Sequence, residues 1–365
     1  MMKKLLSVVF LLLSFLSFSQ NTPLSNKATV SIFTCGRGNE LYTTFGHTAI
    51  RIKDENTNLD VVYNYGAFDF NTENFYLKFV KGDLQYFINA SSYNDFIYEY
   101  QMEKREVIEQ TLNFSPTQKQ ELFDLLNASL FSEERSYTYK FIDRNCTTMV
   151  VEKINKMIGK ELIQKVDDTS ISYRELLYPY FANHFYYKLG INIIFGAKTD
   201  NKAVKLFLPS ELMHSLDKAK INGIPLVIKK ETLIQGNELE SGFSFVDSIY
   251  FIALLLLLLV VTNKKKVFVT YLFVAGLLGL FLSLVGLYSL HKELLWNYNA
   301  LLFNPLFLLL PFLKGKWFKK LIQTCFVFLG IYSLLLLTKP HVWLMLPFIA
   351  ATAYMLWKLQ KSERK

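Results

Sequence analysis

Cys146 lies in the stretch "YKFIDRNCTTMVVEKI", between an asparagine and two threonines, where a β-rich segment runs into a helical pattern. A thiolate is a nucleophile, and a helix N-terminus lowers the pKa of a cysteine because free backbone N–H groups and the helix dipole stabilise negative charge. Asn145 is available to cap this helix. The pattern predicts Cys146 as a nucleophile, with one half of a disulfide and a buried structural thiol as the alternatives.

A nucleophilic thiol needs a base, and His47 in "FGHTAIRI" is the best candidate. The β-branched residues after it predict a strand, which would hold the imidazole in place. Asn64, on the following predicted strand, is favoured over Tyr65 as the group that orients His47. A structural role for His47 is the alternative. His184 and His214 lie in helical or loop contexts and look structural.

These residues are carried by elements that the local patterns predict. Strands are expected at 28–34, 48–53, 61–68 and 84–89, and helices at 115–130 and 146–159. The first helix begins with Ser115 and Pro116, a capping pattern, and the second ends at Gly159. Because the strands and helices are segregated along the chain, we expect an α+β fold with an antiparallel sheet.

Composition divides the 365 residues into unlike halves, with 51% hydrophobic residues overall. Residues 263–365 contain thirteen Lys and Arg against two Glu, a net charge of +11. Because the whole chain has a net charge of +9, the rest of the chain carries −2. The basic residues form short clusters beside apolar runs. This pattern is typical of membrane topology signals and excludes a phosphate-binding face for nucleic acid.

The apolar runs predict five membrane spans, at 248–262, 267–290, 294–312, 321–338 and 342–357. The clusters "NKKK", "KGKWFKK" and "KLQKSERK" are expected on the cytoplasmic side, which leaves the N-terminal part outside and the C-terminus inside. Lys3, Lys4 and an apolar run at 5–16 predict a secretory signal, with an uncleaved helix as the alternative. We expect a signal peptide at 1–19, an exported domain at 20–245 and a five-helix membrane domain at 246–365.

Several longer motifs carry a family resemblance. "SIFTCGRGNELYTTFGHTAIRI", "VYNYGAFDF", "NFYLKFVKGDLQY", "RNCTT", "SYRELL" and "GAKTDNKAVKLFLPSEL" occur in an order that resembles the exported domain of the Bacteroidota Lnb-type lipoprotein N-acyltransferases. A more distant likeness is to circularly permuted papain-like thiol enzymes of the NlpC type and the lecithin:retinol acyltransferase group. Arg144 departs from the small or acidic residue expected before Asn-Cys.

The resemblance implies a permuted papain-like exported domain on the outer face of the bacterial inner membrane. It implies that Cys146 takes an acyl chain from a phospholipid, with His47 as acid and base, and passes it to the N-terminal diacylglyceryl-cysteine of a lipoprotein. Asn64 would complete the catalytic set. The remaining candidates are residues for binding: Asn145, Arg51, Tyr65, His291 and Asn297. The loop that holds the last two is rich in asparagine, and polar groups near hydrocarbon are costly.

Two other functions stay open. A membrane-anchored NlpC-like thiol peptidase would use the same residues on cell-wall peptides, and a non-enzymatic envelope receptor would bridge Cys35 to Cys146. The scarce His and Cys residues lack the spacing of metal ligands, and no glycine-rich loop suits a phosphate. We therefore expect no cofactor. The expected partners are phospholipid, diacylated lipoproteins and the membrane.

Overall fold

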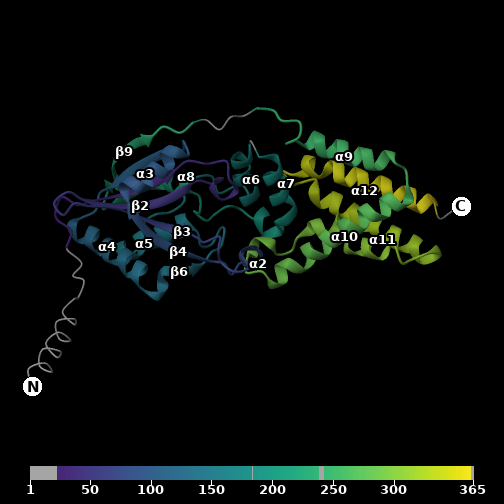
Figure 1. Cartoon of the computed structure of the whole chain (residues 1–365), viewed down its shortest axis with the longest axis horizontal. Coiled ribbons are helices and arrows are strands. Elements are labelled where there is room, and N and C mark those ends of the chain that lie inside the picture. The colour runs from purple at the N-terminus through teal and green to yellow at the C-terminus, as the bar shows by residue number, and fades with distance from the viewer. Residues whose placement is uncertain (1–22, 183, 238–241, 363–365) are drawn as a thin grey trace, which may run out of the picture.

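The structure is a computed structural model of the chain and describes residues 23–182, 184–237 and 242–362. Two parts follow one another along its long axis, a sheet with covering helices and a group of apolar helices near the C-terminus (Figure 1). The predicted signal peptide at 1–19 lies outside the described residues.

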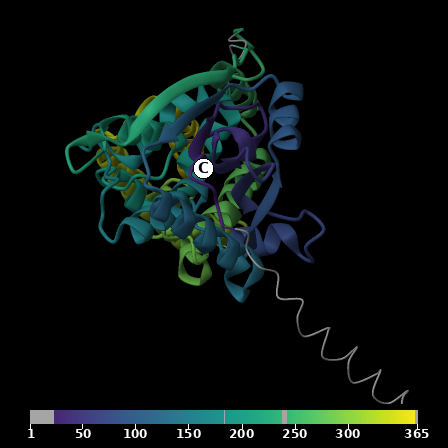
Figure 2. The same cartoon turned by 90° about the vertical axis from the view of Figure 1, so that its left-hand side faces the viewer.

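An antiparallel sheet of seven strands forms the N-terminal part, in the order β6-β4-β3-β2-β1-β5-β9. Its strands are β1 (Thr29–Cys35), β2 (His47–Asp54), β3 (Leu59–Ala67), β4 (Gln85–Ser92), β5 (Val107–Leu112), β6 (Ser136–Thr138) and β9 (Val227–Ile234). Two short strands, β7 (Lys220–Ile221) and β8 (Ile224–Pro225), pair separately. Figure 2 views the molecule from the sheet side. The four predicted strands and the antiparallel sheet are confirmed, but the expected segregation is not, because α2, α3 and α4 lie between strands of the sheet.

Helices pack on both faces of this sheet, because successive strand residues point to opposite sides. Ile32 faces a core built with α4, α5 and α8, whereas Phe33 faces α3. The helices of this part are α2 (Phe75–Lys81), α3 (Tyr93–Met102), α4 (Pro116–Phe131), α5 (Cys146–Ile158), α6 (Tyr173–Leu177), α7 (Phe185–Ile194) and α8 (Pro209–Lys218). The 3-10 helices are η1 (Leu41–Thr43), η2 (Glu133–Arg135), η3 (Tyr178–Phe181) and η4 (Ala197–Asp200). Both helices predicted from the sequence are present.

The C-terminal part contains four apolar α-helices among the described residues. They are α9 (Ile249–Val261), α10 (Lys265–Tyr288), α11 (Gly315–Leu336) and α12 (Val342–Ser362). The last three are long and apolar enough to cross a membrane, whereas α9 has 13 residues. The prediction of five helical spans is therefore not confirmed.

The third predicted span, at 294–312, is wrong as a helix. The chain here forms the short 3-10 helices η5 (Lys292–Leu294), η6 (Tyr298–Leu301) and η7 (Pro305–Leu309). Asn297 and Asn304 accept hydrogen bonds from backbone N–H groups two residues ahead, and Pro305 has no N–H to donate. These local bonds compete with a continuous helix.

Glycines of α10 allow this irregular segment to lie against the helix. A Cβ added at Gly279 would stand 1.3 Å from the Phe303 carbonyl oxygen, and one at Gly276 would stand 3.2 Å from Leu308. Irregular backbone is tolerated at membrane depth only where protein covers it. The close packing on α10 supplies that cover on one side.

The two parts meet at a first contact, called here the α2 junction, between residues 79–81 of α2 and residues 289–291 after α10. Ser289 Oγ donates to the Val80 carbonyl at 2.8 Å, and the Leu290 N–H donates to the Lys81 carbonyl at 2.7 Å. His291 Nε2 lies 3.0 Å from the Phe79 carbonyl oxygen.

A second contact, the Arg174 junction, is formed by Arg174, Asp200 and Asn192 of the first part with Tyr298 and Asn299 of the second. Arg174 Nε donates to Asp200 Oδ1 at 2.7 Å, and Tyr298 Oη donates to Asp200 Oδ2 at 2.8 Å. Asn299 Nδ2 donates to the Asn192 carbonyl at 2.8 Å. The bonds from Tyr298 and Asn299 cross between the parts and fix how one sits on the other, while Arg174 holds Asp200 in place.

Candidate functional site

Cys146 is the first residue of α5, and its position is set by the cap that precedes it. Asn145 Oδ1 accepts from the Thr148 N–H at 3.0 Å, and Thr148 Oγ1 accepts from the Asn145 N–H at 2.8 Å, which is a capping box. Asn145 Nδ2 donates to the carbonyls of Phe141 and Phe207. Asn145, predicted as a binding residue, has its amide committed to these backbone groups, and it fixes the start of the helix.

His47 begins β2 and interacts with Cys146, which helps to raise the pKa of His47. Its Nε2 lies 3.2 Å from Asn64 Oδ1 on the neighbouring strand β3. A ring protonated at Nε2 donates to this oxygen, and its Nδ1 is then the nitrogen left for the thiol. Gly46, with φ of +80°, precedes the strand, and a Cβ there would stand 2.5 Å from the Cys35 carbonyl oxygen. The structure therefore brings together the predicted residues Cys146, His47 and Asn64.

The electrostatic environment shifts the pKa of Cys146 and the pKa of His47 toward the charged forms. Burial by itself raises the pKa of Cys146, but the charge and hydrogen bond of His47, with hydrogen bonds from Thr48 and Thr147, leave this pKa lowered. For His47, burial lowers the pKa, but the neighbouring Cys146 and the hydrogen bond with Asn64 leave it raised. Each group thus stabilises the charged form of the other.

Cys35 lacks these features. It is buried and free, and burial raises its pKa to about 12. Cys146 is also free, so the disulfide on which the receptor alternative depends is not formed in the structure.

Beside the thiol lies Gly66, which the sequence reasoning missed. Gly66 has φ of +99° at a β-bulge in β3. A Cβ built there would lie 3.6 Å from Cys146 Cβ, 3.9 Å from Tyr137 Oη and 4.0 Å from His47 Cε1. A side chain at this position would stand between the three groups, so glycine leaves that space open.

Tyr137, on β6, was also missed. Its hydroxyl is buried and has no hydrogen-bond partner among the described residues. Burial raises the pKa of Tyr137 well above its ordinary value, so the hydroxyl keeps its proton. A buried donor without a partner beside a nucleophile suits an oxyanion, which a reaction would create only transiently. The glycine in "NYGAF" is the one sequence signal for this corner of the site.

Arg51 and Tyr65, both predicted as binding residues, are not brought to this site. Arg51 makes two 2.7 Å hydrogen bonds to Asp60 and an ion pair of 3.1 Å with Glu109. It lies four residues, about 13 Å of strand, from His47. Tyr65 is fully buried in the core cluster shared with α4 and α5.

The other two predicted binding residues serve contacts between the parts. His291 belongs to the α2 junction, and Asn297 Nδ2 donates to the carbonyls of Ile193 and Ile194 at 2.8 Å each. The two histidines expected to be structural make contacts within the sheet part, where His214 pairs with Asp167 and His184 stacks on Tyr187.

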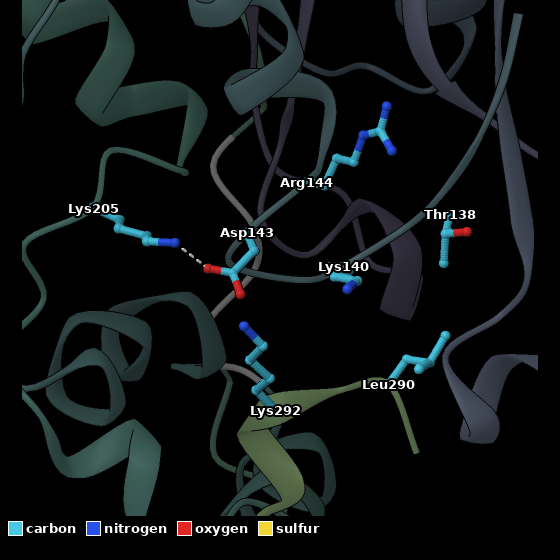
Figure 3. A pocket seen from close by; sticks show the side chains of 7 residues that line it. All are labelled: Thr138, Lys140, Asp143, Arg144, Lys205, Leu290 and Lys292. Atoms are coloured by element: carbon cyan, nitrogen blue, oxygen red, sulfur yellow. Dashed lines mark hydrogen bonds and ion pairs between the residues drawn. The ribbon is translucent and has the colours of Figure 1, made fainter. Parts of the chain in front are cut away.

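A cavity of about 490 Å³ opens next to the α2 junction, and we call it the cationic cavity. Figure 3 shows the side chains that line it: Thr138, Lys140, Asp143, Arg144, Lys205, Leu290 and Lys292. Five come from residues 138–144 and 205 of the sheet part, and two come from the residues just after α10. The sequence reasoning did not predict it, although it noted Arg144 as unusual.

The fold indicates a membrane protein, since three helices are long and apolar enough to cross a membrane, and its sheet domain brings a cysteine, a histidine and an asparagine together. The family model described as the Lnb N-terminal periplasmic domain matches residues 15–178, a range that includes Cys146, His47 and Asn64. This match supports an Lnb-type family, which suggests the processing of membrane lipoproteins, and it supports a periplasmic N-terminal domain.

Comparison with curated proteins gave no match, and comparison with solved structures gave none either. The likeness to permuted papain-like enzymes therefore stays a prediction.

Proposed function

We propose that this protein N-acylates the N-terminal diacylglyceryl-cysteine of lipoproteins, using a phospholipid as acyl donor and Cys146 as the acyl carrier. The observation that carries the proposal is the Cys146–His47–Asn64 arrangement at the start of α5, inside a domain similar to the Lnb periplasmic domain. A lowered thiol pKa is what a nucleophile requires.

In the first step the Cys146 thiolate attacks the carbonyl carbon of a phospholipid ester. A C–S bond forms, the ester C–O bond breaks, and His47 gives its proton to the departing lysophospholipid oxygen. The oxyanion formed on the way would accept hydrogen bonds from the Cys146 backbone N–H and from Tyr137 Oη. The product is an acyl thioester on Cys146.

In the second step the neutral α-amine of the lipoprotein cysteine attacks the thioester. A C–N bond forms, the C–S bond breaks, and His47 accepts the proton that the amine loses. The amide product leaves and Cys146 returns as thiolate beside the imidazolium. No electrons are gained or lost, so the cycle needs no redox cofactor.

Both substrates are lipids, and an apolar surface leads from the site toward the helices. Phe68, two residues after Gly66, packs in an aromatic cluster with Phe70, Phe75 and Tyr42. Exposed side chains of α2 extend this surface to the α2 junction: Tyr76 is 76% exposed and Leu77 is 70% exposed. Exposed apolar patches of this kind mark membrane or ligand contacts, so we propose that the acyl chains of the substrates lie along this surface.

The test uses the full chain in phospholipid vesicles with a synthetic diacylated lipopeptide. Mass spectrometry of the lipopeptide should show the added mass of one fatty acyl chain on the amine, and this gain should be absent with Cys146→Ala. Cleavage of cell-wall peptides without any change in the lipopeptide would overturn the proposal in favour of the thiol peptidase.

A further inference from the structure

We propose that the cationic cavity holds the phosphate of the acyl-donor phospholipid and so distinguishes the donor from the acceptor. This rests on the proposed function. It adds a binding site for an anionic headgroup, formed jointly by the sheet part and the chain segment that follows α10.

The charge of the cavity calls for an anion. Four basic side chains line it, Lys140, Arg144, Lys205 and Lys292, against the single carboxylate of Asp143. Lys205 and Lys292 reach toward Asp143 from two sides (Figure 3), and Lys205 pairs with it. Lys198 Nζ also lies 3.5 Å from the carboxylate of Asp143. One carboxylate cannot neutralise this set, and charged hydrogen bonds from Lys and Arg are the usual partners of phosphate.

The cavity also lies where lipid headgroups are expected. Leu290 and Lys292 come directly after α10, a helix of 24 residues that is long enough to cross a membrane. The lysines at 264–266 lie at the other end of that helix. The cavity therefore stands at the sheet-side end of a membrane-crossing helix, where headgroup phosphates meet water.

A phosphate in this cavity would place the ester of the same lipid near the thiol. Arg144 is two residues from Cys146, a separation of at most about 7 Å along the chain. Thr138 lines the cavity, and its neighbour Tyr137 lies beside Gly66 and the thiol. The Arg144 guanidinium lies 5.2 Å from the centre of the Tyr137 ring and so links the two sites. In a glycerophospholipid the ester and the phosphate share one glycerol, so they can occupy adjoining sites.

The two lipid substrates differ in the group that this cavity would recognise. The donor carries a phosphodiester, whereas the diacylglyceryl-cysteine acceptor has a thioether and no phosphate. A cationic cavity beside the thiol therefore favours phospholipid in the first step. It gives the acceptor no such anchor.

The experiment measures lipid binding and acyl transfer by the full chain in neutral detergent. Native mass spectrometry compares phosphatidylglycerol and phosphatidylethanolamine with diacylglycerol, which lacks the phosphate. We expect the unaltered protein to retain the phospholipids preferentially. The variant Lys140→Ala/Lys292→Ala should lose that preference and raise the KM for phospholipid about tenfold, as expected for losing charged hydrogen bonds. Lys218→Ala/Lys229→Ala removes the same charge from residues that do not line the cavity and should change neither quantity.

The outcomes separate this inference from the proposed function. Acyl transfer that is equally efficient in the cavity variant and the unaltered protein, with equal lipid preference, would overturn the cavity proposal and leave the function standing. Phospholipid binding that depends on the cavity lysines, without any acyl transfer, would support the phosphate site and contradict the proposed N-acylation. Inorganic phosphate that binds the unaltered protein in a Lys140- and Lys292-dependent manner, while phospholipids do not, would show a site for free phosphate and contradict the lipid assignment.

Discussion

The sheet part meets the apolar helices at two places that are built in opposite ways. At the Arg174 junction the charged groups are buried and paired: Arg174 is fully buried and hydrogen-bonds Asp200, Asn192 and Thr199, as well as two backbone carbonyls. At the α2 junction a cavity remains, and its basic side chains outnumber its carboxylates.

This difference indicates a division of roles. Buried charges are costly unless they are paired, so the Arg174 junction is a fixed contact that holds the two parts in one orientation. An excess of one charge around an open cavity gains nothing for the folded protein and leaves capacity for an anionic ligand. Cys146 lies two residues from Arg144, which lines this cavity.

The largest effect on activity should follow from changing His47, on the side of the α2 junction. His47→Ala should lower the rate of acyl transfer about 10²- to 10⁴-fold, because it removes the group that takes and returns the proton. Transfer to the lipopeptide measures this effect. His214→Ala, at a half-exposed histidine paired with Asp167, is the matched control and should leave the rate close to normal. Equal losses in both variants would remove the reason for singling out His47.

A change at the Arg174 junction should instead lower the stability of the folded protein. Arg174→Ala leaves Asp200 buried without its main partner, which should cost about 3–5 kcal/mol of unfolding free energy. The melting temperature of the full chain in detergent should fall clearly. Arg144→Ala, at an exposed arginine that lines the cationic cavity, should change the melting temperature little. If the two variants melt alike, the contrast between the junctions is wrong.

Tyr137→Phe tests whether the Tyr137 hydroxyl, beside Cys146, donates to the oxyanion. Losing one oxyanion donor should lower kcat about 10²- to 10³-fold with little change in KM, since the hydroxyl acts only in the transition state. Its ring still fills the same space, so folding should be retained. Tyr63→Phe, at a buried tyrosine that donates to Asn127, is the control for loss of a buried hydroxyl. An unchanged kcat for Tyr137→Phe would exclude this donor.

The smallest expected effect is a shift in the pH dependence of thiol alkylation, which reports directly on Cys146. Iodoacetamide reacts with thiolate, so the labelling rate of Cys146 should have its midpoint below the ordinary thiol value of 9.0. His47→Ala removes the stabilising charge while burial remains, so the midpoint should move upward by about one to three units. Cys35, with a pKa raised to about 12, should not react at neutral pH. A midpoint that stays in place without His47 would mean that another group activates the thiol.

The sequence allowed much of the sheet part and the centre of the site to be predicted. Strand and capping patterns are local, so the strands that carry His47 and Asn64 and the helix that begins at Cys146 could be inferred. The three residues meet because two neighbouring strands and one helix start are enough to place them.

What was missed depends on contacts between distant segments. The cationic cavity joins residues 138–144 to Lys205 and Lys292, and no local pattern indicates that these come together. Tyr137 became a candidate only when its hydroxyl was found without a partner. The pairing of Arg51 with Asp60 and Glu109 was not predicted, because these partners lie on two other strands. The third apolar run looked like a helix because hydropathy does not register the local bonds of Asn297 and Asn304.

The central claim is that Cys146 carries the acyl chain, and one measurement tests it directly. The full chain is incubated in phospholipid vesicles without acceptor, digested, and its cysteine peptides are weighed by mass spectrometry. The Cys146 peptide should carry a fatty acyl mass that hydroxylamine removes and that disappears when diacylated lipopeptide is added, while the Cys35 peptide stays unmodified. Lipopeptide acylation that proceeds at the normal rate in Cys146→Ala, with no acyl mass on Cys146 in the unaltered protein, would contradict the account.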